Sequence, residues 1–591
     1  MKRSAPQTLP DLALTLSQRG DQVALRFARG DIWTELSYSA VGEAVSEIAR
    51  GLSALGVEPG DRVAILAATR PEWTLVDLGA LAAGSVVVPI YHSDSAGECH
   101  YILVHSDSRL VFCENEEQLA KVAEIRAQCP RLDHIVMLEG SGPGAISLDE
   151  LRERGRQVDP GAPARIAADI GPDDLATIVY TSGTTGPPKG CMTTNGNLIR
   201  TARMYEQQVD LGPGKVAFMF LPLAHSLARV TQIVLLDVGA TIAYWRGDSA
   251  KLLEDLARTR PTHVPAVPRV FEKIHAMALV NAEEQGALRR SVFIRALSTG
   301  RRARQLEREG RRGDPLQRLR HALADRLVLS KVRALFGGHL ELALTGAAPI
   351  AREVLEFFDA CGVLVLEGYG LSESTAAATL NTTAARRFGT AGRPLPGCEV
   401  SIAPDGEILI RGPNVFGGYF KNDVATQEAL GEDGWLATGD LGSLDADGYL
   451  QITGRKKDII ITSGGKNISP ANIEAALREI RWVSEAVVYG DQRPYLVALL
   501  TLDRDDADAL AERVGAPAGV AAMAGDERVR EELEREVQDI NRRFARVEQI
   551  KRFAILDRDL TQQDGELTPT LKVKRQAVYA EFRDVLDALY E

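Results

Sequence analysis

Apolar residues follow two alternating patterns along the first third of the chain. Between residues 38 and 57 they recur every three or four positions, which predicts an amphipathic helix. The next apolar run, residues 62–66, is short and uninterrupted, as is typical of a buried strand. A helix at 73–83 and a strand at 85–90 repeat this order. Helices that alternate with buried strands predict helix layers on a mostly parallel sheet, so the expected fold class is α/β.

The longest apolar region, residues 216–245, is interrupted by His225, Arg229 and Asp237. A helix that crosses a bilayer needs about 20 consecutive, predominantly apolar residues. We therefore predict strands and a buried helix here, and no membrane span.

The pattern changes after residue 390. Short apolar runs flank Asp-Gly pairs at 405–406 and 447–448, which is a strong hairpin signal and predicts a β-rich subdomain at about 390–454. A charged, glycine-flanked segment follows, and then helix and strand patterns that predict a small α+β domain. We expect an N-terminal body at 1–454, a hinge at 455–458 and a C-terminal lid domain at 455–591.

Charge and cysteine content narrow the class of protein. The 69 basic and 81 acidic residues give a net charge of −12, which argues against a general nucleic-acid binder. The six cysteines are scattered and form no C-x-x-C pair, so reduced thiols fit better than disulfides or a zinc site. The N-terminus has no apolar signal segment, and we expect a cytoplasmic protein.

One segment has the opposite charge. From Arg289 to Arg333 there are thirteen arginines and one lysine against four acidic residues, a balance of 14 − 4 = +10. Leucines lie among the arginines, so the segment could form basic amphipathic helices of the kind that lie on anionic membranes. That interpretation predicts peripheral contact with the inner membrane face, and a solvated helical insertion is the alternative.

The densest polar pattern is residues 178–190, Ile-Val-Tyr-Thr-Ser-Gly-Thr-Thr-Gly-Pro-Pro-Lys-Gly. After a strand end it supplies four hydroxyl side chains, three glycines and one lysine, namely Thr181, Ser182, Gly183, Thr184, Thr185, Gly186, Lys189 and Gly190. Backbone N–H groups turned inward by glycines bind anionic oxygen, and a lysine adds a point charge suited to phosphate. A polyphosphate-binding loop is the prediction. Walker spacing fails, because Gly190 follows Lys189 where a serine or threonine is required.

This stretch resembles the phosphate loop of the adenylate-forming (ANL) superfamily: acyl-CoA synthetases, firefly-type luciferases and the adenylation domains of peptide synthetases. The resemblance spans roughly residues 20–580, and residues 261–274 look like a stretch typical of long-chain fatty acyl-CoA synthetases. It implies that residues 181–189 hold the phosphates of ATP.

Two turns follow apolar strands and match the family's nucleotide motifs. In residues 342–350 the small residues Gly346, Ala347 and Ala348 would let a flat ring pack on the backbone, and the resemblance places adenine there. Residues 363–374 match the second motif with Glu367, Gly368, Tyr369, Gly370, Ser372 and Glu373. The resemblance implies that Tyr369 stacks on adenine, Ser372 donates to a phosphate and Glu373 holds Mg²⁺, a hard cation that prefers carboxylate and phosphate oxygen.

The remaining site residues depend mainly on the resemblance. The pattern around His225, which follows a strand, favours a structural histidine when taken alone, but the resemblance implies that His225 lies beside the acyl carboxylate. The family's roles then fall on Asp440 for the ribose hydroxyls, Arg455 for ribose and phosphate, Lys457 for the hinge pivot, Gly464 and Gly465 for the coenzyme A channel, and Lys572 for adenylation. Leu571 stands where many members have glycine, which leaves Lys574 as the alternative to Lys572.

The complete motif order predicts an ATP- and Mg²⁺-dependent enzyme that converts a fatty acid to acyl-AMP and then, with coenzyme A, to acyl-CoA. Long-chain acids are the expected substrates, and the expected assembly is a monomer or homodimer. The alternative is a fatty acyl-AMP ligase, or another acid-adenylating enzyme, that transfers the acyl group to a carrier protein. A non-catalytic binding protein or a membrane scaffold would leave Glu373 and Lys572 unexplained.

Overall fold

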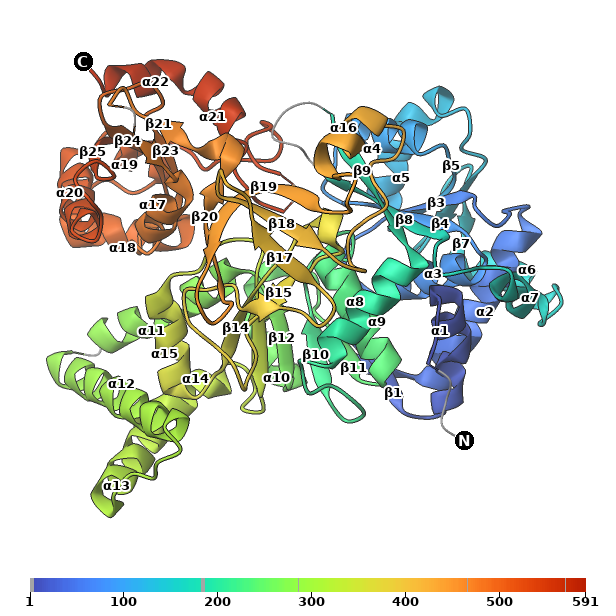
Figure 1. Ribbon diagram of the computed structural model, residues 1–591, viewed down its shortest axis with the longest axis horizontal. Helices are drawn as coiled ribbons and strands as arrows, with labels where there is room; N and C mark the ends of the chain where they lie inside the picture. The colour runs from blue at the N-terminus through green and yellow to red at the C-terminus, as the bar shows by residue number, and fades with distance from the viewer. Residues whose placement is uncertain (1–4, 182–186, 285, 465, 569) are drawn as a thin grey trace.

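The computed structural model describes residues 5–181, 187–284, 286–464, 466–568 and 570–591. A large α/β body is built on two wide sheets and one small sheet, and a smaller α+β unit follows at the C-terminus (Figure 1). This architecture confirms the predicted fold class.

The first wide sheet includes the strands on either side of the predicted phosphate loop. Its strands follow the order β7-β6-β5-β3-β4-β8-β9. Their bounds are β3 (Arg62–Leu66), β4 (Val86–Ile90), β5 (Ser108–Cys113), β6 (His134–Met137), β7 (Ile146–Ser147), β8 (Leu175–Thr181) and β9 (Lys189–Thr194). Neighbours are parallel except β8 and β9, which pair as an antiparallel hairpin. Helices on this half are α1 (Leu9–Thr15), α2 (Tyr38–Ala54), α3 (Pro71–Ala82), α4 (Ala96–His105), α5 (Glu116–Ile125), α6 (Leu148–Arg156) and α7 (Ala162–Ala168).

The second wide sheet follows the order β16-β15-β14-β13-β12-β10-β11-β1-β2. Its strands are β1 (Val23–Arg29), β2 (Ile32–Ser37), β10 (Val216–Met219), β11 (Thr241–Tyr244), β12 (His263–Ala266), β13 (Leu342–Thr345), β14 (Val365–Tyr369), β15 (Thr379–Leu380) and β16 (Arg393–Pro394). The strands from β14 to β1 run parallel, and β2, β15 and β16 are antiparallel at the edges.

The main core lies between the two wide sheets. Val63 and Ile65 of β3 belong to it, whereas Ala64 and Leu66 belong to a second core on the other face. Such alternation is what a strand buried on both faces requires. Helices α8 (Asn195–Glu206) and α9 (Ser226–Val238) also contribute to the main core. The apolar region 216–245 forms β10, α9 and β11, which confirms the prediction of strands and a buried helix.

A small antiparallel sheet completes the body, with strands β17 (Glu399–Ile402), β18 (Glu407–Arg411), β19 (Leu436–Leu444) and β20 (Leu450–Arg455). The predicted Asp-Gly turns join β17 to β18 and β19 to β20, and Gly406 adopts a φ of +89°, which glycine tolerates best. α16 (Asp423–Ala429) lies between β18 and β19.

The C-terminal unit has its own buried core. Its strands are β21 (Ile460–Ile461), β22 (Asn467–Ile468), β23 (Val483–Tyr489), β24 (Leu496–Leu502) and β25 (Ile550–Ile555), and its helices are α17 (Pro470–Leu477), α18 (Arg504–Val514), α19 (Val520–Ala524), α20 (Glu527–Asn541), α21 (Arg575–Glu581) and α22 (Arg583–Ala588). Two side-chain contacts illustrate how it meets the body. Arg269 pairs with Glu485 at 2.5 Å, and the Gln562 amide donates to Ser93 Oγ at 3.2 Å.

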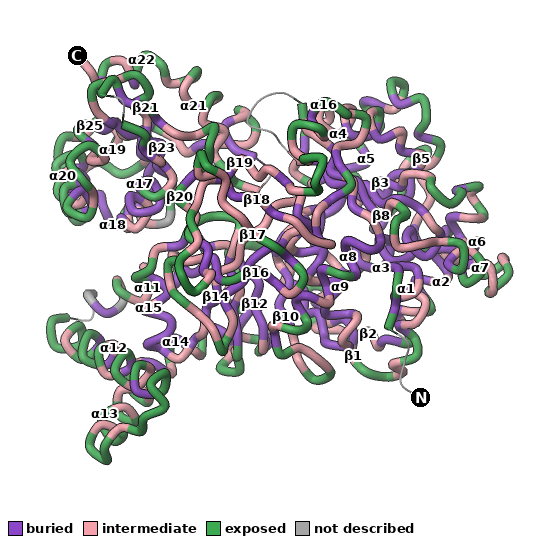
Figure 2. The backbone as a smooth tube through the Cα atoms, in the orientation of Figure 1, coloured by how far each residue is buried: buried purple, intermediate pink, exposed green. Residues whose placement is uncertain are grey.

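The basic segment forms a helical projection at the lower left of Figure 1. It contains α12 (Ala287–Arg308), α13 (Pro315–Ala324), a π-helical turn and α14 (Ser330–Ala334), between α11 (Pro268–Glu284) and α15 (Arg352–Cys361). α12 buries Phe293 and Leu306, but α13 buries no residue, and Figure 2 shows it exposed for most of its length. Among the described residues, no helix combines the length and the apolar character that a bilayer crossing requires.

Candidate active site

The phosphate-loop segment is held as a hairpin at the edge of the first sheet. Thr181 at the end of β8 lies opposite Lys189 at the start of β9, and the Thr181 hydroxyl donates to the Lys189 carbonyl at 3.4 Å. The predicted contacts Ser182, Gly183, Thr184 and Thr185 lie outside the described residues. The described part therefore fixes both ends of the loop.

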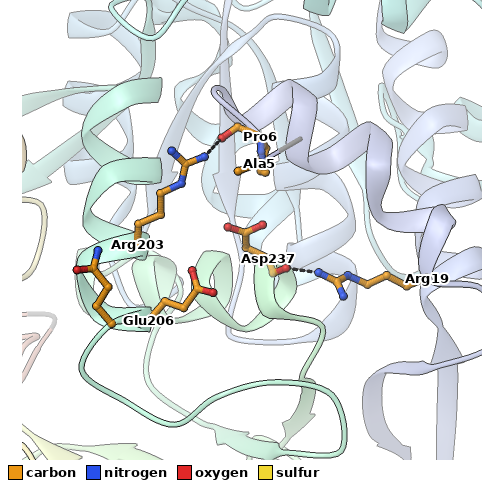
Figure 3. A pocket seen from close by; sticks show the side chains of 7 residues that line it. Ala5, Pro6, Arg19, Arg203, Glu206 and Asp237 are labelled. Carbon is orange, nitrogen blue, oxygen red and sulfur yellow. Dashed lines mark hydrogen bonds between the residues drawn. The ribbon is translucent and has the colours of Figure 1, made fainter. Parts of the chain in front are cut away.

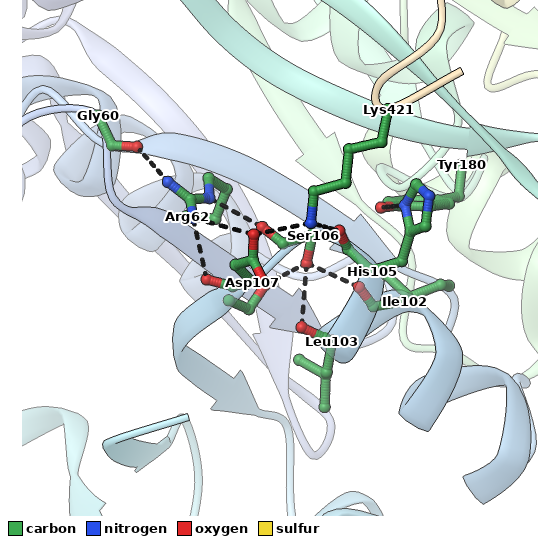
Figure 4. Close-up of polar contacts among 10 residues, drawn as sticks. Gly60, Arg62, Ile102, Leu103, His105, Ser106, Asp107, Tyr180 and Lys421 are labelled. Atoms are coloured by element: carbon green, nitrogen blue, oxygen red, sulfur yellow. Dashed lines mark hydrogen bonds and ion pairs between the residues drawn. The ribbon is translucent and has the colours of Figure 1, made fainter. Parts of the chain in front are cut away.

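Polar contacts anchor this hairpin to α4 and to the loop after β18 (Figure 4). The Tyr180 hydroxyl lies 2.8 Å from His105 Nδ1, and Lys421 Nζ donates at 2.8 Å both to the His105 carbonyl and to Asp107 Oδ2. The Tyr101 hydroxyl donates to the Pro188 carbonyl at 3.1 Å. Strand, helix and loop thus hold one another beside the phosphate-loop segment.

Tyr419 joins the two charged groups expected around the phosphates. Its hydroxyl donates to Glu373 Oε1 at 2.7 Å, and Lys189 Nζ lies 5.0 Å from the centre of its ring. Burial, together with the Glu373 charge, raises the pKa of Tyr419, so it stays a donor. Sequence reasoning missed Tyr419, and the only signal was the Gly417-Gly418 pair before it; Gly418 has a φ of +110°.

Asp440 stands at the centre of a second cluster. Its Oδ2 accepts from the Tyr369 hydroxyl at 2.7 Å and its Oδ1 from Arg455 Nε at 2.8 Å, while its side chain is 8 % exposed. The pairing of β19 with β20 places Asp440 opposite Arg455. A carboxylate oxygen accepts two hydrogen bonds, so both oxygens keep capacity for ribose hydroxyls.

The two small-residue turns lie next to each other. β13 and β14 are parallel neighbours, so the turn carrying Gly346, Ala347 and Ala348 meets the Gly368–Gly370 segment where the strands end. A Cβ added at Gly346 would lie 3.0 Å from the Gly368 carbonyl oxygen, and one at Gly370 would lie 2.4 Å from the Ala376 oxygen. The glycines therefore permit close backbone approach at the carboxyl ends of parallel strands, where α/β folds bind ligands.

Glu367 on β14 is a carboxyl that burial keeps protonated. Burial raises its pKa to about 8, although the Gly389 N–H donates to its Oε2 at 3.1 Å and opposes the shift. In this form the side chain can donate a hydrogen bond.

The stability of the protein should depend on pH through Glu367. The folded pKa of about 8 exceeds the ordinary value of 4.5, so the stabilisation from this group is full below about pH 4.5 and is lost as the pH rises through 8. We expect Glu367→Gln to lose less unfolding free energy than the parent between pH 5 and pH 9 in urea titrations. The exposed Glu432→Gln serves as control, and equal pH slopes for all three proteins would contradict the assignment.

His225 caps the N-terminus of α9. Its Nδ1 accepts from the Leu227 N–H at 3.2 Å, so the neutral ring carries its proton on Nε2. Burial, with a contribution from the Lys572 charge, lowers the pKa of His225 to about 4. Ser226 Oγ lies 3.3 Å from Ser372 Oγ, which brings the His225 loop against the Tyr369–Glu373 turn.

Lys572 reaches this group of residues from the C-terminal unit. Its side chain reaches solvent, but nearby protein groups partly desolvate the ammonium group and lower the pKa of Lys572. The positive charge of Arg455 also lowers this pKa, whereas the negative charges of Asp440 and Glu373 raise it. The Lys574 charge instead acts on Asp94. Lys572 is thus electrostatically coupled to Arg455, Asp440 and Glu373.

The segment between body and C-terminal unit is tied to both. Lys456 Nζ donates to Asp405 at 2.6 Å and Glu407 at 3.0 Å on the body, whereas Asp458 lies 3.7 Å from Arg575 of the C-terminal unit. Lys457 between them is exposed. Gly464 lies exposed between β21 and β22, and Gly465 falls outside the described residues.

The donor set around Glu373 fits Mg²⁺ of the kind bound with nucleotides. Such an ion keeps water and phosphate oxygens and needs only one or two carboxylates. The described residues contain no group of three His, Cys, Asp or Glu side chains placed to bind a metal. Glu373, held by Tyr419, would thus hold the ion together with phosphates.

A cavity of about 620 Å³ lies elsewhere (Figure 3). Arg19, Arg203, Glu206 and Asp237 line it, and none of the described site residues does. Asp237 is near the C-terminal end of α9, about 18 Å along the helix from His225 at a rise of 1.5 Å per residue. The predicted motifs therefore converge away from this cavity.

Comparison with known proteins agrees with these motifs. Residues 12–420 match the family model of AMP-binding enzymes, and residues 457–591 match the AMP-binding enzyme C-terminal domain. Long-chain-fatty-acid–CoA ligase FadD15 of Mycobacterium tuberculosis is 41% identical over 95% of this chain and 93% of its own. Long-chain-fatty-acid–CoA ligase ACSBG1 of Homo sapiens is 34% identical over 98% of this chain and 84% of its own.

Solved structures agree on the fold. The adenylation domain of a carboxylate reductase from Mycobacterium chelonae superposes with a TM-score of 0.81 at 22% identity, covering 100% of this chain and 92% of that one. A fatty acyl CoA synthetase of Mycobacterium tuberculosis gives 0.63 at 23% identity, covering 98% and 99%. With its motifs, its fold and both family matches in agreement, the chain belongs to the AMP-binding enzyme family, the superfamily of adenylate-forming enzymes.

Proposed function

We propose that the protein is an ATP-dependent long-chain-fatty-acid–CoA ligase. Its relatives with that name match it over nearly their whole length. One observation carries the proposal: Lys572 of the C-terminal unit lies in the electrostatic field of Glu373, Asp440 and Arg455 of the body. This is the arrangement that adenylation of an acid requires.

The first half-reaction joins the fatty acid carboxylate to the α-phosphate of ATP and releases pyrophosphate. In-line attack needs the two substrates held in register and the developing phosphate charge spread over cations. Lys572 and Lys189 supply side-chain charge, and Asp440 with Arg455 orients the ribose. Neutral His225, with its proton on Nε2, can orient the acid. Mg²⁺, when bound at Glu373, neutralises phosphate charge.

The second half-reaction transfers the acyl group to the coenzyme A thiol and releases AMP. We propose that the body 1–454 stays fixed while the lid 455–591 turns at Lys457, bringing Gly464 and Gly465 to the pantetheine arm. The separate anchoring of Lys456 and Asp458 supports a pivot between them. This leaves Lys572 a role in the first step only.

A coupled assay of AMP release tests the function. We expect turnover that requires ATP, Mg²⁺ and coenzyme A together, and that is fastest with acids of long chain in a series from two to eighteen carbons. Acyl-AMP formation with no consumption of coenzyme A would favour the fatty acyl-AMP ligase that serves a carrier protein. Absence of ATP cleavage to AMP with every acid would overturn the proposal.

We also propose that the enzyme is cytoplasmic, a monomer or homodimer, and contacts the inner membrane face through the Arg289–Arg333 projection. Four leucines at helical spacing on α13 and the turn after it are exposed by more than half: Leu316, Leu319, Leu323 and Leu327. The projection carries +10 in a chain of net −12, so the complementary surface is anionic. Exposed leucines among arginines are typical of helices that lie on anionic lipid.

Vesicle flotation should show this contact. We expect the protein to float with vesicles containing anionic lipid, and the variant Leu316→Ser/Leu319→Ser/Leu323→Ser to bind them at least about tenfold more weakly, since each buried leucine contributes more than about 1 kcal/mol. The control replaces Ile32, Val424 and Val547, which are each exposed by half or more, with serine. Unchanged flotation of the leucine variant would leave the projection as a solvated insertion.

A further inference from the structure

Arg229 is an arginine inside the main core. It lies in the first turn of α9, four residues after His225, and its side chain is 1% exposed. The residues around it on α9 are otherwise mostly apolar, and the sequence pattern alone would place an apolar side chain here. A cation in the first turn also opposes the helix dipole, whose N-terminal end is positive. A buried charge that breaks two local rules indicates a specific role.

Its partners come from two other elements. The guanidinium pairs with Asp77 of α3, which is 0% exposed, with Nε 3.3 Å from Oδ2. It also donates to the hydroxyl of Thr177 on β8. Gln232, one turn further along α9, donates to the same Asp77 at 3.1 Å and accepts from Thr74 of α3 at 2.6 Å. These contacts form a closed polar seam between α9, α3 and β8.

This seam joins the two halves of the substrate site. α9 begins directly after its cap residue His225, and the Arg229 N–H donates to the His225 carbonyl at 3.2 Å. β8 ends at Thr181, four residues after Thr177, where the phosphate-loop segment starts. The loop before His225 is held from the same side, because Thr69 before α3 donates to the Leu221 carbonyl at 2.7 Å and accepts from the Leu223 N–H at 2.9 Å.

We propose that Arg229 is a positioning residue. It fixes the position of His225, which lies beside the acyl carboxylate, relative to β8, the strand that leads into the phosphate loop. The inference rests on the proposed function, because it assigns the acid to His225 and the nucleotide phosphates to the loop. Bound acid and bound ATP react only when the carboxylate oxygen and the α-phosphorus are held close and in line. A rigid link between the elements that hold them fixes this distance without touching either substrate.

The test separates positioning from stability. Arg229→Met leaves the residues that bind ATP and those that bind the acid unchanged. We therefore expect KM for ATP and for the acid to change less than about threefold. We expect kcat of ATP–pyrophosphate exchange to fall by about 10- to 100-fold, since a misplacement of about 1 Å costs up to a hundredfold. Arg229→Lys keeps the charge opposite Asp77 and should recover part of kcat.

The chain offers a matched control in a second buried ion pair. Arg246, which follows β11, donates to Asp255 of α10 (Leu252–Thr259) at 2.6 Å, and Asp255 is 0% exposed. This pair therefore bridges neither α9 nor β8. Arg246→Met should lower the melting temperature much as Arg229→Met does but leave kcat unchanged below the transition. Equal kcat for the Arg229 and Arg246 variants would overturn the proposal.

If Arg229→Met does not fold, Thr177→Val provides a second test of the link between Arg229 and β8. It removes the acceptor on β8 and keeps the Asp77 pair, and we expect the same fall of kcat with near-constant KM, smaller in size. A parental kcat in this variant would also reject the link. If the parent protein itself does not exchange pyrophosphate, the proposed function fails; if the parent exchanges and the Arg229 variant matches it, only this inference fails.

Discussion

Replacing Lys572 with alanine should abolish most acyl-AMP formation and spare the transfer from acyl-AMP to coenzyme A. Lys572 is the cation that the C-terminal unit brings to Glu373, Asp440 and Arg455. A donor aimed at charge that develops in the transition state is worth about 10² to 10³ in rate. We expect the ATP–pyrophosphate exchange rate to fall by at least that factor, while supplied acyl-AMP still reacts with coenzyme A at close to the parental rate.

Lys574→Ala is the matched control, because it removes the same charge two residues away. The charge of Lys574 acts on Asp94. We expect this variant to keep exchange within a few-fold of the parent. Loss of both half-reactions in the Lys572 variant would mean that the residue supports the whole site, and selective loss in Lys574→Ala would transfer the role to that lysine.

The loop that holds Lys572 also explains where the sequence departs from its family. Leu571 has a φ of +59° and is 58% exposed. Glycine adopts this left-handed conformation without strain, which accounts for its use at this place in many members. Leucine carries a local backbone strain of about 1–2 kcal/mol in this conformation. Its exposed side chain adds little contact with the rest of the protein, and the Thr568 N–H still closes the loop on the Lys572 carbonyl at 2.8 Å.

Local patterns predicted most of the fold. Strands such as β3 and β8 are short apolar runs, and the Asp405-Gly406 turn needs only its own residues to form a hairpin. Some predicted helix boundaries differ from the observed ones by a few residues. For example, α3 begins at Pro71 and not at residue 73, because proline suits the first helical position.

The contacts that join distant segments could not be predicted from patterns. Tyr419 and Glu373 are 46 positions apart, and Arg229 and Asp77 are 152 apart. Neither pair has a spacing signal, because their meeting depends on how whole strands and helices pack. The family resemblance supplied Glu373 and Lys572, but it left Tyr419 and the role of Arg229 undetected. The roles of the site residues, and those of Ser182–Thr185 and Gly465, stay predictions.

Glu373→Gln should weaken the dependence of nucleotide binding on Mg²⁺ and lower adenylation by at least about 10²-fold. The glutamine keeps the size of the side chain and can still accept from Tyr419, but it removes the negative charge that a hard cation requires. We expect the Mg²⁺ concentration for half-maximal exchange to rise strongly. Binding of a fluorescent ATP analogue, measured with and without Mg²⁺, should lose most of its metal-dependent increase.

Tyr419→Phe separates the charge of Glu373 from its orientation. This variant keeps the aromatic ring 5.0 Å from Lys189 and removes only the hydroxyl that donates to Glu373 at 2.7 Å. Since the carboxylate remains, the ATP analogue should still bind more tightly with Mg²⁺, and exchange should fall by only about tenfold, as expected for the loss of one hydrogen bond to a charged group. If Glu373→Gln keeps the metal response of the parent, Glu373 does not hold the ion, and the charge around the phosphates must come from Lys189 and Lys572.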